Sequence, residues 1–183
     1  MSERGPQNEA LGPTVSPAGL TDVLAPDLSV VFCGLNPATS AVRDGHNFSS
    51  PSNRFWRVLH LSGFTPYLLR ADQERQALEY GCGVTAFVSR ATKSAVELGP
   101  QDYASAAPEF ERKLRAFRPK RLAFLGKPAF ASLCASQRFD WGRQAMTFAG
   151  AEVWVLPNPS GLNRSFSLQR LVEEYARLRA SYE

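Results

Sequence analysis

Cysteine and histidine are scarce in this sequence, and their scarcity argues against several kinds of active site. The 183 residues include three cysteines, Cys33, Cys82 and Cys134, and two histidines. So few and so widely separated cysteines disfavour a four-cysteine zinc or iron–sulfur site, and we expect reduced thiols, with Cys33 and Cys134 packed as small hydrophobes. Two histidines offer little for a Ser-His-Asp triad, and the Gly-x-Ser-x-Gly motif is missing, which disfavours an acyl-transfer hydrolase. We expect no metal site.

Long apolar segments are also missing. No run approaches the roughly 20 residues of a membrane-spanning helix. Met1–Pro17 is rich in Gly, Pro, Ser and Glu and lacks the apolar centre of a secretory signal, so we expect a cytoplasmic protein, associated with the nucleoid if bacterial. With 44% hydrophobic and 21% charged residues, the composition is that of a folded domain, and the net charge of +4 only weakly indicates a polyanionic partner. We expect a disordered tail over residues 1–20 and a single domain over residues 21–183.

Apolar, β-rich runs alternate with helical patterns along the chain. The predicted strands are Ser29–Cys33, Val84–Val88, Arg121–Gly126 and Glu152–Pro157. The predicted helices are Arg54–Gly63, Gln73–Tyr80, Pro108–Phe117, Pro128–Ser136 and a last one from Leu168 to the C-terminus. This alternation predicts an α/β three-layer sandwich, in which helices flank a central, mostly parallel sheet of four to five strands.

Two polar loops follow the first and the last predicted strand, and each contains an Asn-Pro pair. The pairs are Asn36-Pro37 within Gly34–Ser40 and Asn158-Pro159 within Pro157–Arg164. One such pair alone would be an ordinary turn. In an open parallel sheet, however, ligands bind beyond the carboxyl ends of the strands, so the two loops predict a binding site at that edge. Neither loop has the Gly-x-Gly-x-x-Gly spacing or the Lys-Ser/Thr ending of a nucleotide-binding loop.

Four separated motifs carry a resemblance to a known family. They are Val31–Pro37, Phe48–Trp56, Cys82–Thr85 and Val155–Arg164. Together they resemble the mismatch-specific uracil-DNA glycosylases, family 2 of the uracil-DNA glycosylase superfamily and relatives of thymine-DNA glycosylase. The similarity runs in consistent order from about Leu24 to Tyr175, and several motifs at matching intervals are far more specific than any one of them.

The resemblance implies a fold, a reaction and a partner. The fold would be that of the uracil-DNA glycosylases, and the reaction the hydrolysis of the N-glycosidic bond of uracil or thymine opposite guanine. The enzyme would be slow, would need no metal or other cofactor and would have no lyase step. Its partner would be double-stranded DNA with a G:U or related mismatch, from which the base must be flipped before it can be reached.

The resemblance also assigns roles to residues of the first half of the chain and to Asn158. Asn36 corresponds to the asparagine that positions the attacking water, and because an amide is a negligible base, slow turnover is expected. Phe48 corresponds to the aromatic residue on which the flipped base stacks, with a place in the core as the alternative. Asn158 stands where faster relatives have a histidine and can still donate to a uracil oxygen. Thr85 matches a pocket threonine, with a structural hydroxyl at a strand end as the alternative.

The remaining residues of the second loop match the part of the family that enters the duplex. Leu162 corresponds to the apolar wedge that fills the gap left by the flipped base. Backbone groups of Gly161 and Asn163 would meet the unpaired guanine. Arg164 would support the insertion or contact a phosphate.

Three features depart from the family pattern or have no assigned role. Ala38 stands where the family usually has glycine, and its methyl group leaves the tolerance for thymine or bulky adducts open. His46 lies in a loop that tends to carry small or apolar residues, and a solvated side chain is favoured over a catalytic one. The segment Ser89–Ser94 could grip phosphates or form a solvated loop.

A monofunctional DNA glycosylase is the leading interpretation of the sequence. The alternative is a non-catalytic module that binds damaged DNA or other nucleic acid, and Asn36 argues against it. A nucleotide-binding α/β protein is a third reading, which the missing glycine loop disfavours. The preferred damaged base and the opposite base stay open, as does the oligomeric state, although we expect a monomer because single-domain base-flipping enzymes work alone.

Overall fold

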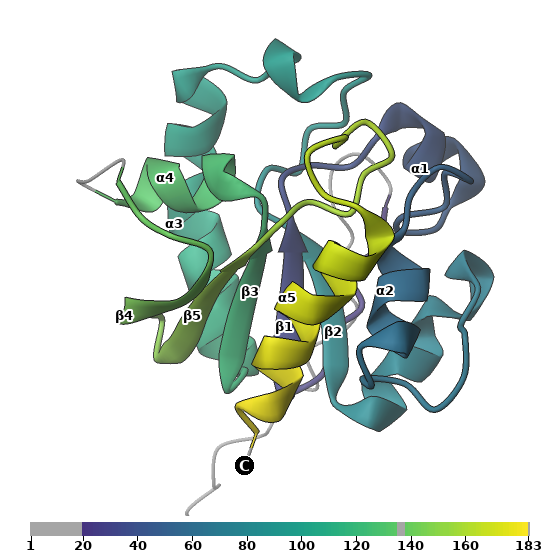
Figure 1. The fold of residues 1–183 in the computed structure, drawn as a ribbon. Helices are drawn as coiled ribbons and strands as arrows, with labels where there is room; N and C mark the ends of the chain where they lie inside the picture. The colour runs from purple at the N-terminus through teal and green to yellow at the C-terminus, as the bar shows by residue number, and fades with distance from the viewer. Residues whose placement is uncertain (1–19, 135–137, 183) are drawn as a thin grey trace, which may run out of the picture.

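A five-stranded, mostly parallel sheet forms the centre of the molecule (Figure 1). The computed structural model describes residues 20–134 and 138–182. The strands are β1 (Val30–Gly34), β2 (Cys82–Ala86), β3 (Arg121–Leu125), β4 (Gly142–Phe148) and β5 (Ala151–Leu156). They lie in the order β2-β1-β3-β5-β4, in which β4 is antiparallel to β5 and every other neighbouring pair is parallel. The predicted fold class is confirmed.

Helices cover both faces of the sheet. They are α1 (Thr39–Asp44), α2 (Phe55–Leu61), α3 (Pro100–Phe117), α4 (Lys127–Leu133) and α5 (Leu168–Ala180), with 3₁₀ segments η1 (Ala71–Tyr80) and η2 (Ala95–Glu97). Side chains of α2, η1 and α5 form one hydrophobic cluster with the sheet, and those of α3 and α4 form a second cluster on the opposite face. The three predicted layers are therefore present (Figure 1).

The apolar run of the central strand β1 is continuous because helices cover both of its faces. Val30 and Phe32 belong to the cluster under α2 and α5, whereas Val31 and Cys33 belong to the cluster under α3 and α4. All four are 0% exposed. Successive strand residues point to opposite faces, so a strand covered on both faces needs apolar residues at every position. Burying one Phe or Val side chain contributes about 1.5–3 kcal/mol.

Several element boundaries differ from the sequence prediction, and β4 was not predicted at all. The β4 sequence mixes polar and apolar residues without regular alternation, and its side chains are half-buried or exposed, as is common in an edge strand. Helix α3 begins at Pro100 rather than Pro108, because Gly99 and Pro100 form its N-terminus and Pro108 lies within the helix. Strand β2 begins at Cys82 rather than Val84, and so includes Gly83. A glycine is needed there because a Cβ would lie 2.6 Å from a Leu28 methyl group.

The cysteines are free thiols. Cys33 and Cys82 are fully buried, and burial raises the pKa of Cys33 well above its usual range and that of Cys82 to about 12. Cys134 is only partly buried, so the expectation of a buried residue is met less fully there. Cys33 is buried and its thiol stays protonated, which agrees with its expected role as a small hydrophobic residue.

The N-terminal part of the domain lies beside the edge strand β2. Leu20 is 4% exposed, and Val23 pairs with Val84 of β2 in an isolated antiparallel bridge. Residues 1–19 lie outside the described part of the chain, so the expected tail stays a prediction.

Candidate active site

Loops that follow β1, β2 and β5 enclose a cavity of about 390 Å³ at the carboxyl edge of the sheet. Backbone hydrogen bonds extend the β1–β2 pairing into these loops, among them those from Phe87 N to the Gly34 carbonyl (2.9 Å) and from Thr92 N to the Pro37 carbonyl (3.1 Å). The predicted site residues in the cavity wall are Asn36, Ala38, Phe48, Thr85, Asn158, Leu162 and Asn163. The structure thus brings the two predicted loops together around one cavity of the size of a small-molecule site.

The side-chain amide of Asn36 is oriented by the loop after β2. Its Nδ2 donates to the carbonyl oxygen of Arg90 at 2.9 Å and to the hydroxyl of Thr92 at 2.8 Å. A main-chain carbonyl can only accept, so the NH₂ end of the amide must face Arg90. Asn36 lines the cavity, and Oδ1 is the end of its amide that can accept a hydrogen bond.

Arg90 and Thr92 are themselves held in place. They belong to Ser89–Ser94, the segment expected either to grip phosphates or to form a solvated loop. The Arg90 guanidinium donates to both carboxylate oxygens of Asp102 (2.9 Å each) and to the carbonyl of Glu97 (2.8 Å). Hydrogen bonds from Arg90, and then from Gly99 N, lower the pKa of Asp102 to about 2. Thr92 is 4% exposed. This segment therefore orients Asn36, a role that sequence reasoning did not assign to it.

Phe48 lies between the core and the cavity. Its ring centroid is 4.1 Å from that of Phe55, with 31° between the ring planes, and Phe55 is fully buried. Phe48 is half-buried and borders the cavity. Its φ of 55° is rare for a non-glycine residue, and such conformations cluster at functional sites. The ring can stack on a planar group while packing on Phe55.

Thr85 contributes to the cavity wall, but its hydroxyl is engaged elsewhere. The hydroxyl donates to Oδ1 of Asp22 at 2.7 Å and accepts from Nζ of Lys113 at 3.2 Å. Asp22 and Lys113 also form a largely buried ion pair of 2.8 Å. These contacts match the structural alternative for Thr85, because its hydroxyl joins the N-terminal segment and α3 to β2.

Asn158 and Asn163 brace the loop after β5. Asn158 Oδ1 accepts from Ser160 N at 2.9 Å, and the Asn158 carbonyl accepts from Nδ2 of Asn163 at 2.9 Å. The first contact identifies the Oδ1 end of the Asn158 amide, so its Nδ2 is the end that can donate to a ligand carbonyl in the cavity. Arg164 is exposed on the same loop, as an arginine that contacts a phosphate would be.

Leu162 projects from this loop and is 86% exposed. An apolar side chain this exposed contributes almost no hydrophobic stabilisation to the free protein. The neighbouring Gly161 packs so closely on the loop before α2 that a Cβ would lie 2.6 Å from the Ser52 carbonyl oxygen. Gly161 is thus required by a close backbone approach, which also fixes where Leu162 emerges.

Arg54 anchors the same loop, and sequence analysis missed this role. The guanidinium donates to four main-chain carbonyls: from Nε to Pro159 (3.2 Å), from Nη1 to Phe166 (2.7 Å), and from Nη2 to Ser160 (2.8 Å) and Asn163 (2.9 Å). Its backbone N also donates to the Pro159 carbonyl at 3.0 Å. The sequence placed Arg54 only at the start of a helix, and no local pattern separates such an arginine from an exposed one.

Two other predictions concern His46 and metal binding. The His46 side chain is 38% exposed and its Nδ1 lies 3.4 Å from Oε1 of Glu74, so it is neither fully solvated nor part of the cavity wall.

Within residues 20–134 and 138–182, no group of three or more His, Cys, Asp or Glu side chains could hold a metal ion. None of the helices in this same part of the chain is long and apolar enough to cross a membrane.

The cavity at the carboxyl edge of this α/β fold has the volume of a small-molecule site, and Asn36, Phe48 and Leu162 border it. The family model of the Uracil DNA glycosylase superfamily matches residues 21–179. The chain belongs to this superfamily. Its fold is similar to the solution NMR structure of a protein from Methanosarcina acetivorans described as a "putative Uracil DNA glycosylase", with 20% identity, a TM-score of 0.60, and coverage of 90% of this chain and 97% of that one.

Proposed function

We propose that the protein is a monofunctional DNA glycosylase that excises uracil mispaired with guanine from double-stranded DNA and so initiates base excision repair. The observation that carries this proposal is the fixed amide of Asn36, whose Nδ2 is held by Arg90 and Thr92. An amide held in this way serves water orientation, which a DNA-binding module would not need.

The reaction follows from the groups around the cavity. A water that donates to Asn36 Oδ1 is directed at C1′ of the flipped nucleotide. The C1′–O bond forms as the C1′–N1 bond breaks, the bonding electrons leave with the base, and the water proton passes to solvent or to the departing base. Asn158 Nδ2 can donate to a base oxygen that gains negative charge, which stabilises the leaving group. Because neither amide can take up a proton, orientation and charge stabilisation carry the rate.

Recognition of the flipped base and of the duplex involves different residues. Phe48 offers a ring for stacking, which contributes about 1–3 kcal/mol per base. Leu162 enters the space that the base leaves, and the Gly161 and Asn163 backbones face the unpaired guanine. Ala38, at the cavity wall, would favour uracil over thymine because its methyl group reduces the room for a substituent at C5. All these groups belong to one chain, so one copy of the protein would suffice for the reaction.

A single-turnover panel tests the proposal. Duplexes with G:U, A:U, G:T and G:ethenocytosine pairs, and single-stranded uracil DNA, are incubated with excess protein and then treated with alkali, which cleaves at abasic sites. We expect G:U to be cleaved fastest, and no strand cleavage before alkali because no lyase step occurs. A retarded duplex without alkali-sensitive sites would instead identify the binding module that is the alternative.

A further inference from the structure

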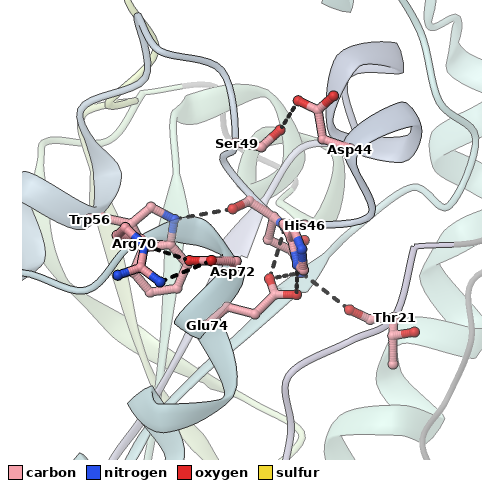
Figure 2. A network of polar contacts seen from close by, with 9 residues as sticks. Thr21, Asp44, His46, Ser49, Trp56, Arg70, Asp72 and Glu74 are labelled. Carbon is pink, nitrogen blue, oxygen red and sulfur yellow. Dashed lines mark hydrogen bonds and ion pairs between the residues drawn. The ribbon is translucent and has the colours of Figure 1, made fainter.

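Glu74 is a buried carboxylate behind the cavity wall, on η1. It is 7% exposed, and its Oε2 accepts from both N (2.8 Å) and Nδ2 (2.9 Å) of Asn47. Its Oε1 faces Nδ1 of His46 at 3.4 Å (Figure 2). A buried carboxylate is costly unless it is hydrogen-bonded. The hydrogen-bond partners of Glu74 are Asn47 and His46, the two residues directly before Phe48.

Asn47 is held from three sides. Glu74 holds its N–H, the indole Nε1 of Trp56 donates to its carbonyl at 3.1 Å, and its Nδ2 also donates to the Thr21 carbonyl at 3.2 Å. Figure 2 shows Trp56, Glu74 and Thr21 converging on this segment from three parts of the chain. The peptide groups on both sides of the Asn47 Cα are therefore fixed by the side chains of Glu74 and Trp56.

The next residue, Phe48, has a φ of 55°. A non-glycine residue keeps such a conformation only where its surroundings determine it strongly. On the far side of Phe48, the Ser49 hydroxyl donates to Oδ2 of Asp44 at 2.9 Å (Figure 2). The contacts before and after Phe48 thus determine where its ring lies relative to the cavity.

We propose that Glu74 is a positioning residue that, together with Trp56, holds the backbone before Phe48 in the conformation that presents the ring to a flipped base. This inference rests on the proposed function, because it assigns Glu74 an effect on base excision through Phe48. Glu74 touches neither the substrate nor the attacking water.

The first test compares Glu74→Gln with Glu79→Gln, a matched change at an exposed position of the same 3₁₀ segment. The glutamine keeps the size of the side chain but removes the negative charge and leaves a single oxygen to accept hydrogen bonds from Asn47 and His46. We expect single-turnover excision from a G:U duplex to fall about tenfold in Glu74→Gln and to stay within about twofold of wild type in Glu79→Gln. Affinity for an abasic duplex should stay within about threefold in both, since Phe48 has no base to stack on there.

A double-mutant cycle separates positioning from a general loss of structure. If Glu74 acts through Phe48, then Glu74→Gln should reduce excision less than about twofold in a Phe48→Ala background. An equal loss with and without the Phe48 ring overturns the proposal. If Glu74→Gln does not fold, Trp56→Phe removes the hydrogen bond to the Asn47 carbonyl while keeping an aromatic ring, and the same selective loss is expected.

A spectroscopic measurement tests the positioning without any excision. 4-Fluorophenylalanine in place of Phe48 reports its surroundings through the ¹⁹F chemical shift. We expect Glu74→Gln to move or broaden this signal and Glu79→Gln to leave it unchanged. If wild type excises no base, the proposed function fails, and the ¹⁹F signal alone still decides the positioning. An unchanged signal in Glu74→Gln overturns the inference even where excision is intact.

Discussion

The side-chain amide of Asn36 donates a 2.8 Å hydrogen bond to the hydroxyl of Thr92, 56 residues further along the chain. This contact joins the loop after β1 to the loop after β2, and an isolated parallel bridge between Ala38 and Thr92 reinforces it. The orientation of the proposed water-positioning group therefore depends on a neighbouring loop and not on Asn36 alone.

Removing the amide tests the role of Asn36. In Asn36→Ala, single-turnover excision should fall by two to four orders of magnitude, roughly, because the amide orients water in the transition state, while affinity for the damaged duplex stays within about tenfold. Rapid-mix excision kinetics and a duplex titration measure the two quantities. Excision within about threefold of wild type would show that another group positions the water.

Thr92 should affect catalysis through its hydroxyl and not through its shape. Thr92→Val keeps the volume but removes the acceptor for Asn36 Nδ2, so excision should fall about tenfold or more. Thr92→Ser keeps the hydroxyl and should stay within about threefold. Single-turnover rates of the two variants, with their thermal unfolding midpoints as a control, decide the matter. Equal rates would mean that the Arg90 carbonyl orients the amide by itself.

Leu162 should matter only in duplex DNA. Leu162→Ala should weaken binding to an abasic duplex and slow excision from double strands more than from single strands, because only a duplex has a gap to fill. The side chain is 86% exposed, so stability should stay within about 0.5 kcal/mol of wild type. The ratio of double-strand to single-strand rates is the measurement, and an unchanged ratio contradicts the wedge role.

Arg54→Lys should loosen the loop that carries Leu162. A lysine offers a single ammonium in place of the planar fork that reaches four carbonyls, so about 1–3 kcal/mol of stability should be lost. Excision from duplexes should fall as well. Arg57→Lys, at an exposed position of α2, is the matched control and should change neither quantity. Chemical denaturation and duplex excision measure both effects, and identical behaviour of the two variants would refute the anchoring role.

The Arg90–Asp102 pair should contribute stability that is lost in acid. The pKa of Asp102 is lowered to about 2 in the folded protein, below the ordinary value near 3.9. A lowered folded-state pKa stabilises above the unfolded pKa, and that contribution disappears as the pH falls from about 4 through about 2. Wild type should therefore exceed Asp102→Asn in denaturation midpoint at pH 6, with the difference shrinking toward pH 2. A difference that is independent of pH would assign the effect to packing.

The sequence by itself determined the α/β class, because buried strands such as β1 carry apolar residues at each position and α5 has a regular amphipathic pattern. It also placed two of the loops that line the cavity, those after β1 and β5, since the carboxyl ends of parallel strands meet at one edge. Local patterns of this kind are readable because they depend on the secondary structure and burial of the segment itself.

The tertiary structure alone decided the contacts that orient the site. The guanidinium of Arg54 meets carbonyls 105 to 112 positions away, and the Glu74 carboxylate meets Asn47 27 positions away. It also decided that the Thr85 hydroxyl bonds to Asp22 and Lys113 and that β4, whose sequence has no regular apolar alternation, pairs at the sheet edge. A hydrogen bond between remote residues depends on where the whole chain places both partners, and neither partner carries a local pattern that names the other.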